Sequence, residues 1–333
     1  MLSLLTIENY RGFEDLKIEP LKRINLIAGK NNVGKTALLQ AILLMQRPNE
    51  PTHNEFYLLP DLPAPGPDVR TRWGWLFYGK RQDLSVLISG IDNSQGTRTL
   101  VLDWRSANSA VTNELNSIAI TCEDSTGIFK GHMTNNQAIV IDENRLTLYP
   151  LAVLRSGWVR SPKQNATDYS ELVAVGRQEE LMYALRPLEP RLTQLTLLIV
   201  GGETTICGDI GIGHLIPLQL MGEGIQRILS IVLEIAKARN GIVLIDEIEN
   251  GLHHSVLVDV WRVVVKAARQ ANVQVFATTH SWECIQSAYQ AFEENDPEDF
   301  RLHRLERING KIEGVTYDHE SLSGSMQFNL EVR

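Results

Sequence analysis

The chain has 333 residues, of which 43% are apolar and 22% are charged, and its formal net charge is −8. This length and composition are typical of a globular protein of about two domains, and the negative charge restricts any DNA contact to a local patch. Three scattered cysteines, no signal peptide and no apolar run of about 18 residues lead us to expect a cytoplasmic protein without a membrane segment.

The first 47 residues predict three strands followed by a loop and a helix. Residues 2–10 and 16–21 alternate between apolar and polar side chains, and residues 24–29 form a short apolar run that suits a buried strand. Apolar residues recur at helical spacing from Thr36 to Met45, and Pro48 ends that helix. The next stretch, residues 48–70, holds six of the 13 prolines and predicts an exposed loop.

The middle of the chain has a strand-rich pattern. Five segments separated by turn residues predict an antiparallel meander, at residues 83–92, 97–104, 116–124, 127–133 and 137–150. Residues 168–190 predict a helix, and residues 192–218 are again typical of strands. From residue 222 onwards helices and strands alternate, which indicates a parallel α/β sheet.

The segment GKNNVGKT, residues 29–36, follows a predicted strand and opens a predicted helix. In that context the pattern predicts a phosphate-binding loop whose N–H groups and helix dipole hold the phosphates of a nucleotide. Lys35 would reach the β- and γ-phosphate oxygens, and the Thr36 hydroxyl would ligate Mg²⁺. The residues expected at the nucleotide are Gly29, Lys30, Asn31, Asn32, Val33, Gly34, Lys35, Thr36 and Ala37.

A second set of polar residues follows two apolar runs further along. Asp246 and Glu247 come directly after the apolar residues 242–245, and His280 ends the predicted strand 273–280. Since parallel sheets bind ligands at the carboxyl ends of their strands, we expect Asp246 to hold Mg²⁺ through water and Glu247 to be the general base. His280 would contact the γ-phosphate or the attacking water, although a purely structural histidine is the alternative.

A helix with an apolar stripe starts after Gly222, Glu223 and Gly224, which we call the GEG turn. Glycines at a helix start let an anion approach closely. Because the phosphate-binding loop already has its own helix, we expect the GEG turn to serve the nucleotide of another subunit.

These motifs together resemble the ABC-class ATPases of the RecF, SMC and OLD group. The resemblance rests on the opening segment through residue 42 and on GEGIQRIL, LIDEIENGLHH and ATTHSWECI, and it is strongest to stand-alone bacterial AAA-type (OLD-like) proteins without a TOPRIM nuclease domain. It implies an α/β P-loop NTPase of ABC-ATPase type with an antiparallel β subdomain and a short helical insertion. The core would be residues 1–47 and 200–333, the β subdomain 48–150 and the helical insertion 151–199.

The resemblance also implies a head-to-tail homodimer that sandwiches two ATP molecules with Mg²⁺. The family's signature falls on the GEG turn, although its usual serine is absent here, and the dimer-facing loop falls on residues 249–253. His280 would be the switch histidine, and the glutamine loop has no secure position. Arg11 either points a basic side chain towards the nucleotide or is a solvated turn residue.

The expected function is therefore a Mg-ATP-hydrolysing switch that controls a separately encoded effector, such as a TOPRIM-like protein, in antiphage defence or DNA maintenance. A RecF-like, ATP-regulated DNA clamp is the main alternative, and a scaffold that binds ATP but barely hydrolyses it is another. Only 53 residues follow His280, and they offer no metal framework, so we expect no nuclease activity in the chain itself.

Overall fold

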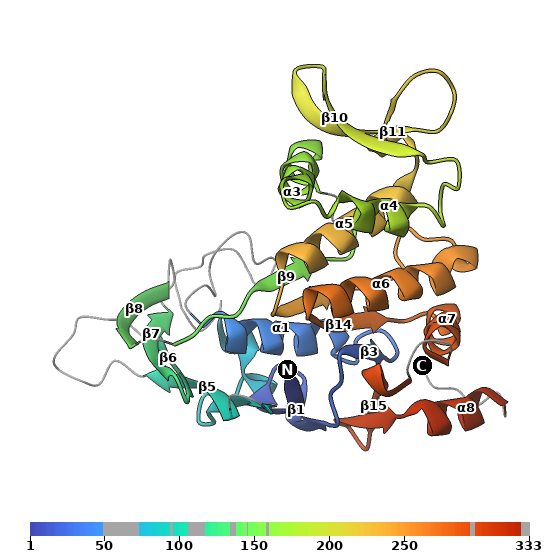
Figure 1. Ribbon diagram of the computed structural model, residues 1–333. Coiled ribbons are helices and arrows are strands. Elements are labelled where there is room, and N and C mark those ends of the chain that lie inside the picture. Colours follow the sequence, from blue (N-terminus) through green and yellow to red (C-terminus); the bar gives the residue numbers. More distant parts are fainter. Residues whose placement is uncertain are drawn as a thin grey trace. The chain divides into compact units, whose positions relative to one another are not determined.

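The structure, a computed structural model, describes residues 1–48, 73–93, 96–105, 117–133, 138–144, 146–157, 160–293 and 297–327. The chain divides into two compact units (Figure 1). Unit 1 comprises residues 1–149 and 301–318, and unit 2 comprises residues 150–300 and the segment that begins at residue 319. Apart from Pro48, the proline-rich loop predicted at 48–70 lies outside the described residues.

Unit 1 contains a seven-stranded antiparallel sheet in the order β2-β1-β4-β5-β6-β7-β8. Its strands are β1 (Leu2–Tyr10), β2 (Phe13–Ile18), β4 (Val86–Asp92), β5 (Gly96–Arg105), β6 (Ser117–Asp124), β7 (Gly127–Met133) and β8 (Ala138–Asn144). The meander predicted from the turn residues is confirmed. It is also continuous with the first two strands, because β1 pairs with β4.

The remaining elements of unit 1 carry the predicted phosphate-binding loop. Strand β3 (Ile24–Ala28) is buried along its whole length, as its uninterrupted apolar pattern predicts, and it leads into the loop before α1 (Lys35–Gln46). Helix α1 packs against β4 and β5. The strands β16 (Lys311–Tyr317), β15 (Phe300–Ile308) and β3 follow one another in that order, so the predicted C-terminal hairpin is also confirmed.

Three parallel strands form the centre of unit 2, in the order β14 (Gln274–Thr279), β13 (Ile242–Ile245) and β9 (Leu151–Leu154). Ile245 pairs with Ala277 of β14 and with Leu154 of β9. The carboxyl ends of the three strands therefore lie at one edge, and the residues that follow them meet there. Strand β9, a run of only four residues, was not predicted.

Unit 2 also contains helices from residue 223 onwards (Figure 1). They are α5 (Glu223–Lys237), α6 (Leu257–Ala271), α7 (Trp282–Glu293) and the unpredicted α8 (His319–Gln327). Helix α5 packs against α6 and β9, and α6 packs against α7. Single 3-10 turns occur at Gly74–Leu76, Tyr78–Lys80, Leu218–Leu220, His254–Val256 and Pro297–Asp299.

The prediction of one helix at 168–190 was wrong, because the structure has two. Helix α3 (Pro162–Ala174) begins earlier, at a capping box in which Ser161 and Gln164 bond each other's main chain. It ends before Gly176, whose φ of +71° is left-handed, and α4 (Gln178–Leu185) follows. The left-handed residue turns the chain and prevents one continuous helix.

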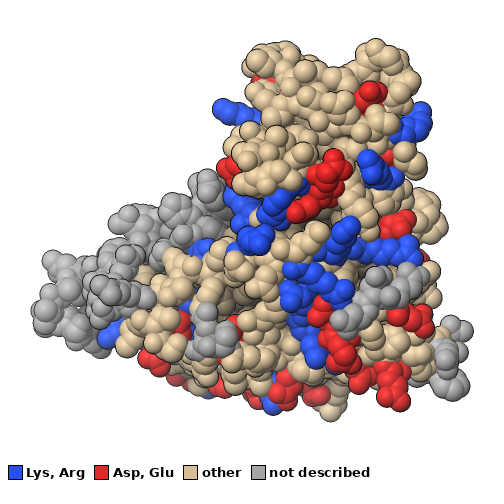
Figure 2. Space-filling view, in the orientation of Figure 1, with Lys and Arg blue, Asp and Glu red and all other residues tan. Residues whose placement is uncertain are grey.

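A small antiparallel sheet, in the order β10-β11-β12, follows α4. Its strands are β10 (Gln194–Val200), β11 (Glu203–Asp209) and β12 (Ile216–Pro217), which confirms the strand pattern at 192–218. The end of β10 carries three exposed apolar side chains, Leu198, Ile199 and Val200. Figure 2 shows the β10–β11 hairpin at the top, and few charged side chains lie on the face of the hairpin that is visible there.

The sequence predicted three segments: a core, a β subdomain and a helical insertion. These segments divide the chain differently from the two compact units, and they stay a prediction. In the described part of the chain, no helix combines the length and the apolar character that crossing a membrane requires.

Candidate functional site

The loop after β3 depends on two glycines in left-handed conformations. Gly29 has φ +148°, and a Cβ atom there would lie 2.6 Å from the carbonyl oxygen of Leu305. Gly34 has φ +98°, and a Cβ atom there would lie 2.8 Å from Cζ of Phe13. Any side chain at either position would therefore clash and strain the backbone, which explains why the first and last residues of this turn are glycines.

Lys35 is buried inside this loop. Its Nζ donates hydrogen bonds to the main-chain oxygens of Gly29, at 2.6 Å, and Lys30, at 3.0 Å. The lysine thus holds the loop closed around its own ammonium group. Helix α1 starts at Lys35 with no acidic residue in its first turn, so its N–H groups present an uncompensated positive dipole end. Both features suit a phosphate group.

The other residues of the loop differ in exposure. Asn31, Asn32 and Thr36 are exposed, whereas Val33 and Ala37 are buried and anchor the loop to unit 1. Arg11 lies in the turn between β1 and β2 with φ +51°, and its N–H bonds the oxygen of Leu76 at 2.9 Å. Its position near a nucleotide stays a prediction.

In unit 2, Asp246 and Glu247 follow β13 at the edge where β9 and β14 also end. Thr278 of β14 connects the two acids. Its hydroxyl donates to Oδ1 of Asp246 at 2.6 Å and accepts from the N–H of Glu247 at 2.8 Å. The sequence identified both acids and the end of β14, but it gave no reason to single out Thr278.

Glu247 has a left-handed backbone, with φ +48°, which is uncommon for a residue with a side chain. Arg227, a buried residue of α5, stabilises this turn. Its Nη2 donates to the main-chain oxygens of Asp246 at 3.0 Å and Glu247 at 2.9 Å, and its Nη1 donates to that of Arg155 at 3.1 Å. Burial lowers the pKa of Arg227, although the nearby carboxylates oppose that shift. One side chain therefore ties α5 to the ends of both β9 and β13.

The carboxylate of Glu247 contacts two side chains. Ser156, which follows β9, donates a hydrogen bond to Oε2, and Nδ1 of the exposed His280 lies 3.4 Å from Oε1. Glu249 holds the main chain at His280, since its Oε1 accepts from the N–H of His280 at 3.0 Å and from the Thr279 hydroxyl at 2.8 Å. Within unit 2 the predicted Asp246, Glu247 and His280 therefore lie together. Among the described residues, no group of three or more His, Cys, Asp or Glu side chains forms a metal site.

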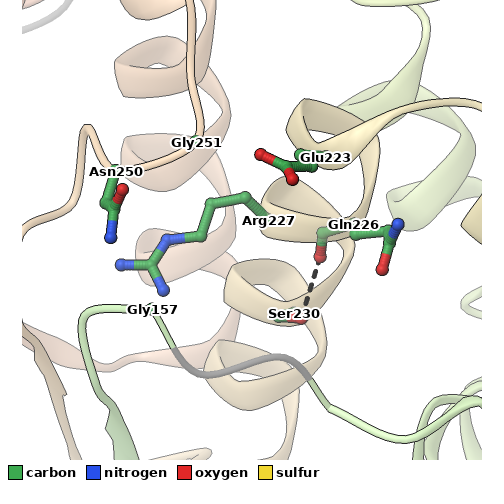
Figure 3. Close-up of a pocket in the computed structure, with 7 residues that line it drawn as sticks. All are labelled: Gly157, Glu223, Gln226, Arg227, Ser230, Asn250 and Gly251. Carbon is green, nitrogen blue, oxygen red and sulfur yellow. Dashed lines mark hydrogen bonds between the residues drawn. The ribbon is translucent and has the colours of Figure 1, made fainter.

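Beside this cluster is a pocket of about 190 Å³ (Figure 3). It is lined by Gly157, Glu223, Gln226, Arg227, Ser230, Asn250 and Gly251. Figure 3 shows that the Arg227 side chain extends from α5 towards Gly157 and Asn250. The pocket therefore brings the start of α5, the turn after β13 and the loop after β9 together.

The GEG turn lies at the edge of this pocket. Gly222 and Glu223 are exposed, Gly222 has φ +109°, and a Cβ atom at Gly222 would meet nothing within 4 Å. Glu223 lies beside Gly251, so the GEG turn and the 249–253 loop are neighbours. Because Glu223 stands in the first turn of α5, it already complements the helix dipole, and α1 is the better suited of the two helix starts for an anion.

Comparison with known proteins shows the family to which this chain belongs. The model of the family described as AAA ATPase domain matches residues 1–156 and 158–285. An "ATP/GTP phosphatase" of Helicobacter pylori is 25% identical over 366 aligned positions, which span 97% of each chain. An uncharacterized protein of Methanocaldococcus jannaschii is 36% identical over 115 positions, which span 34% of this chain and 90% of that protein.

Solved structures show the same fold at low sequence identity. An SMC head bound to the C-winged helix domain of ScpA superposes with a TM-score of 0.53 at 12% identity, covering 98% of this chain and 99% of that one. An Smc head with an extended coiled coil, bound to the C-terminal domain of ScpA from Pyrococcus furiosus, also gives a TM-score of 0.53, at 10% identity and 99% coverage of both chains. This confirms the predicted mixed α/β P-loop ATPase fold. The chain belongs to the AAA ATPase domain family and is an ATPase with the fold of SMC heads.

Proposed function

We propose that the chain is a Mg-ATP-dependent switch in which Glu247 is the general base for hydrolysis. The observation that carries this proposal is the setting of the Glu247 carboxylate. It lies at the carboxyl end of β13 with 35% of its side chain exposed, so water can reach it, and a hydrogen bond from Ser156 holds its orientation. A base must combine access to water with a fixed geometry, and Glu247 has both.

In this proposal residues 29–37 bind the triphosphate. The two main-chain oxygens that hold the Lys35 ammonium are ligands that phosphate oxygens can replace, since a charged donor bonds an anion more strongly than a neutral carbonyl. A hydroxyl from Thr36 and a carboxylate from Asp246, together with phosphate oxygens and water, would supply oxygen ligands of the kind that Mg²⁺ prefers. The ion would neutralise charge on the phosphates.

His280 and Arg11 complete the proposed site. The imidazole of His280 lies beside Glu247 and is exposed, so it can sense whether a γ-phosphate is present. Loss of that phosphate would then change the contacts of the switch, which is what a nucleotide-driven change of state requires. Arg11 would supply a positive charge towards the nucleotide.

We further propose that two copies close over two ATP molecules. The support for this is the exposure of the GEG turn and the open space around Gly222, next to the exposed part of the 249–253 loop. These two segments would face the nucleotide of the second copy, and hydrolysis would reopen the pair. Because the signature serine is absent, this contact would fall on main-chain N–H groups of the turn.

The output would be control of a separately encoded effector. The SMC heads that share this fold were solved with ScpA, so a partner protein on an ATPase of this fold has a precedent in those proteins. We propose an OLD-like role in antiphage defence or DNA maintenance, with a TOPRIM-like protein as the effector. The name of the H. pylori relative makes ATP and GTP the two nucleotides to compare as substrates.

The decisive test is Glu247→Gln in the full chain. We expect phosphate release to fall by at least about a hundredfold, because general bases contribute factors of this size. We also expect the variant to accumulate as an ATP-dependent dimer in light scattering after size exclusion. Glu283→Gln removes the same charge from an exposed position at the start of α7 and serves as the control. Hydrolysis at the normal rate by Glu247→Gln would refute the role of Glu247, and a monomer at saturating ATP would refute the dimer.

A further inference from the structure

The two oxygens of the Glu247 carboxylate have different surroundings. Oε2 accepts a hydrogen bond from the hydroxyl of Ser156, whereas Oε1 faces Nδ1 of His280 at 3.4 Å. The bonded oxygen fixes the orientation of the carboxylate. The other oxygen is the one on which the proton of an attacking water would be placed.

Asn250 sets the direction of the bond from Ser156. Its Nδ2 donates to Oγ of Ser156 at 2.9 Å. An amide nitrogen can only donate, so the serine oxygen is the acceptor in this contact, and its single hydrogen is left for Glu247. The three side chains thus form a relay of hydrogen bonds that runs from Asn250 to Ser156 to Glu247.

Main-chain contacts fix both ends of this relay. Ser156 lies two residues after the end of β9, and Arg227 holds the oxygen of the intervening Arg155. Asn250 lies in the turn after β13, where its own N–H bonds the oxygen of Glu247 at 3.0 Å. The relay therefore joins the segments after two strand ends, through Ser156 and Asn250, which are 94 positions apart in the sequence.

The relay also borders the pocket of Figure 3. Asn250 and Gly157, the residue after Ser156, are both in its lining. Asn250 belongs to the 249–253 loop and has an exposed side chain. A change in the conformation of that loop therefore reaches the carboxylate of Glu247 through only two hydrogen bonds.

We propose that Ser156 and Asn250 are positioning residues for ATP hydrolysis. They hold the Glu247 carboxylate with Oε1 directed at the attacking water, and they link its orientation to the 249–253 loop. This inference rests on the proposed role of Glu247 as the general base. Neither residue touches the nucleotide that Glu247 of the same chain would hydrolyse, so through the relay both act on the chemical step and not on ATP binding.

The test measures kcat and KM for ATP by phosphate release from the full chain. Ser156→Ala is expected to lower kcat about tenfold or more and to leave KM within about twofold, because the lost contact orients the base and does not bind substrate. Ser156→Thr keeps the hydroxyl and is expected to restore most of kcat. Ser85→Ala, at an exposed serine of unit 1 whose hydroxyl bonds Asp103, serves as the control with unchanged kcat.

Substitution of Asn250 by Asp gives an independent test, because it hardly alters the shape of the side chain. In Asn250→Asp the donor becomes an acceptor, which draws the serine hydrogen away from Glu247, so kcat is expected to fall about as far as in Ser156→Ala. Because Asn250 acts through Ser156, Ser156→Ala combined with Asn250→Asp is expected to be no slower than Ser156→Ala alone.

The outcomes separate this inference from the proposed function. If Glu247→Gln abolishes hydrolysis while Ser156→Ala and Asn250→Asp keep the normal kcat, the relay is refuted and the base stands. If Ser156→Ala loses activity and Ser156→Thr does not recover it, or if the effects of the two positions simply multiply, the relay is also refuted. Normal hydrolysis by Glu247→Gln would instead refute the proposed function itself.

Discussion

His303 provides the sharpest test of the energetics of unit 1. This residue of β15 is completely buried, with Nδ1 at 3.0 Å from the Thr316 hydroxyl and Nε2 at 3.4 Å from Oδ1 of Asn25. Asn25 is in β3, the strand that leads into the phosphate-binding loop. Burial, with a smaller contribution from the charge of Arg301, lowers the pKa of His303 to about 3.

The sign and size of the effect follow from proton linkage. An unfolded histidine has a pKa of about 6.5, so between that pH and about pH 3 the unfolded chain binds a proton that the folded chain excludes. The stability due to neutral His303 is therefore fully present above pH 6.5 and is lost as the pH falls towards 3. At about pH 4.5, two pH units below the unfolded pKa, the loss amounts to about 3 kcal/mol.

The perturbation is His303→Gln, which removes the titrating ring and keeps a polar side chain of similar reach. Urea unfolding, followed by circular dichroism, gives the free energy of unfolding of both proteins at about pH 7.5 and about pH 4.5. We expect the wild type to lose about 3 kcal/mol more than the variant between these conditions. His254→Gln, at an exposed histidine, should lose as much as the wild type. Equal losses for His303→Gln and the wild type would refute this reasoning.

Three further substitutions test the sites. Lys35→Ala should abolish nucleotide binding in isothermal titration calorimetry, and ordinary affinity would show that the loop does not use this lysine. Gly34→Ala places a methyl group 2.8 Å from Phe13 at a φ of +98°, so we expect about 2 kcal/mol less stability in urea unfolding together with weaker binding. Arg227→Met removes three hydrogen bonds to main-chain oxygens, one of them to the oxygen of Glu247. It should reduce the free energy of unfolding by about 2–4 kcal/mol and lower kcat with it, whereas a fully active, equally stable variant would contradict the role of Arg227.

Elements with strong local patterns were predictable from the sequence. The run IVLI at 242–245 is uniformly apolar, so it marked both a buried strand and the position at which Asp246 and Glu247 leave it. The glycines of residues 29–36 likewise fixed a loop whose conformation no other residue type allows. Such features depend on neighbours in the sequence and need no knowledge of the rest of the fold.

Features that depend on distant pairing were missed. Strand β9 is the four-residue run LAVL, and only its pairing with β13, about 90 positions later, makes it a strand. Ser156 therefore had no visible connection to Glu247, which is 91 positions away. Arg227 looked like part of the polar face of an amphipathic helix, but its acceptors are main-chain oxygens, which no side-chain pattern can reveal. An apolar run followed by Arg-Ser-Gly was the one available signal for Ser156.

The exposed apolar end of β10 has a practical consequence for every measurement of assembly. Ile199 is 78% exposed and stands beside the exposed Leu198 and Val200, on a strand that contains no charged residue and no proline to discourage pairing with another chain. Self-association through this hairpin would be independent of nucleotide and would grow with protein concentration. Ile199→Lys removes that route and leaves the phosphate-binding loop and the residues around Glu247 unchanged. In this variant, an increase in mass on adding ATP can therefore be assigned to the nucleotide alone.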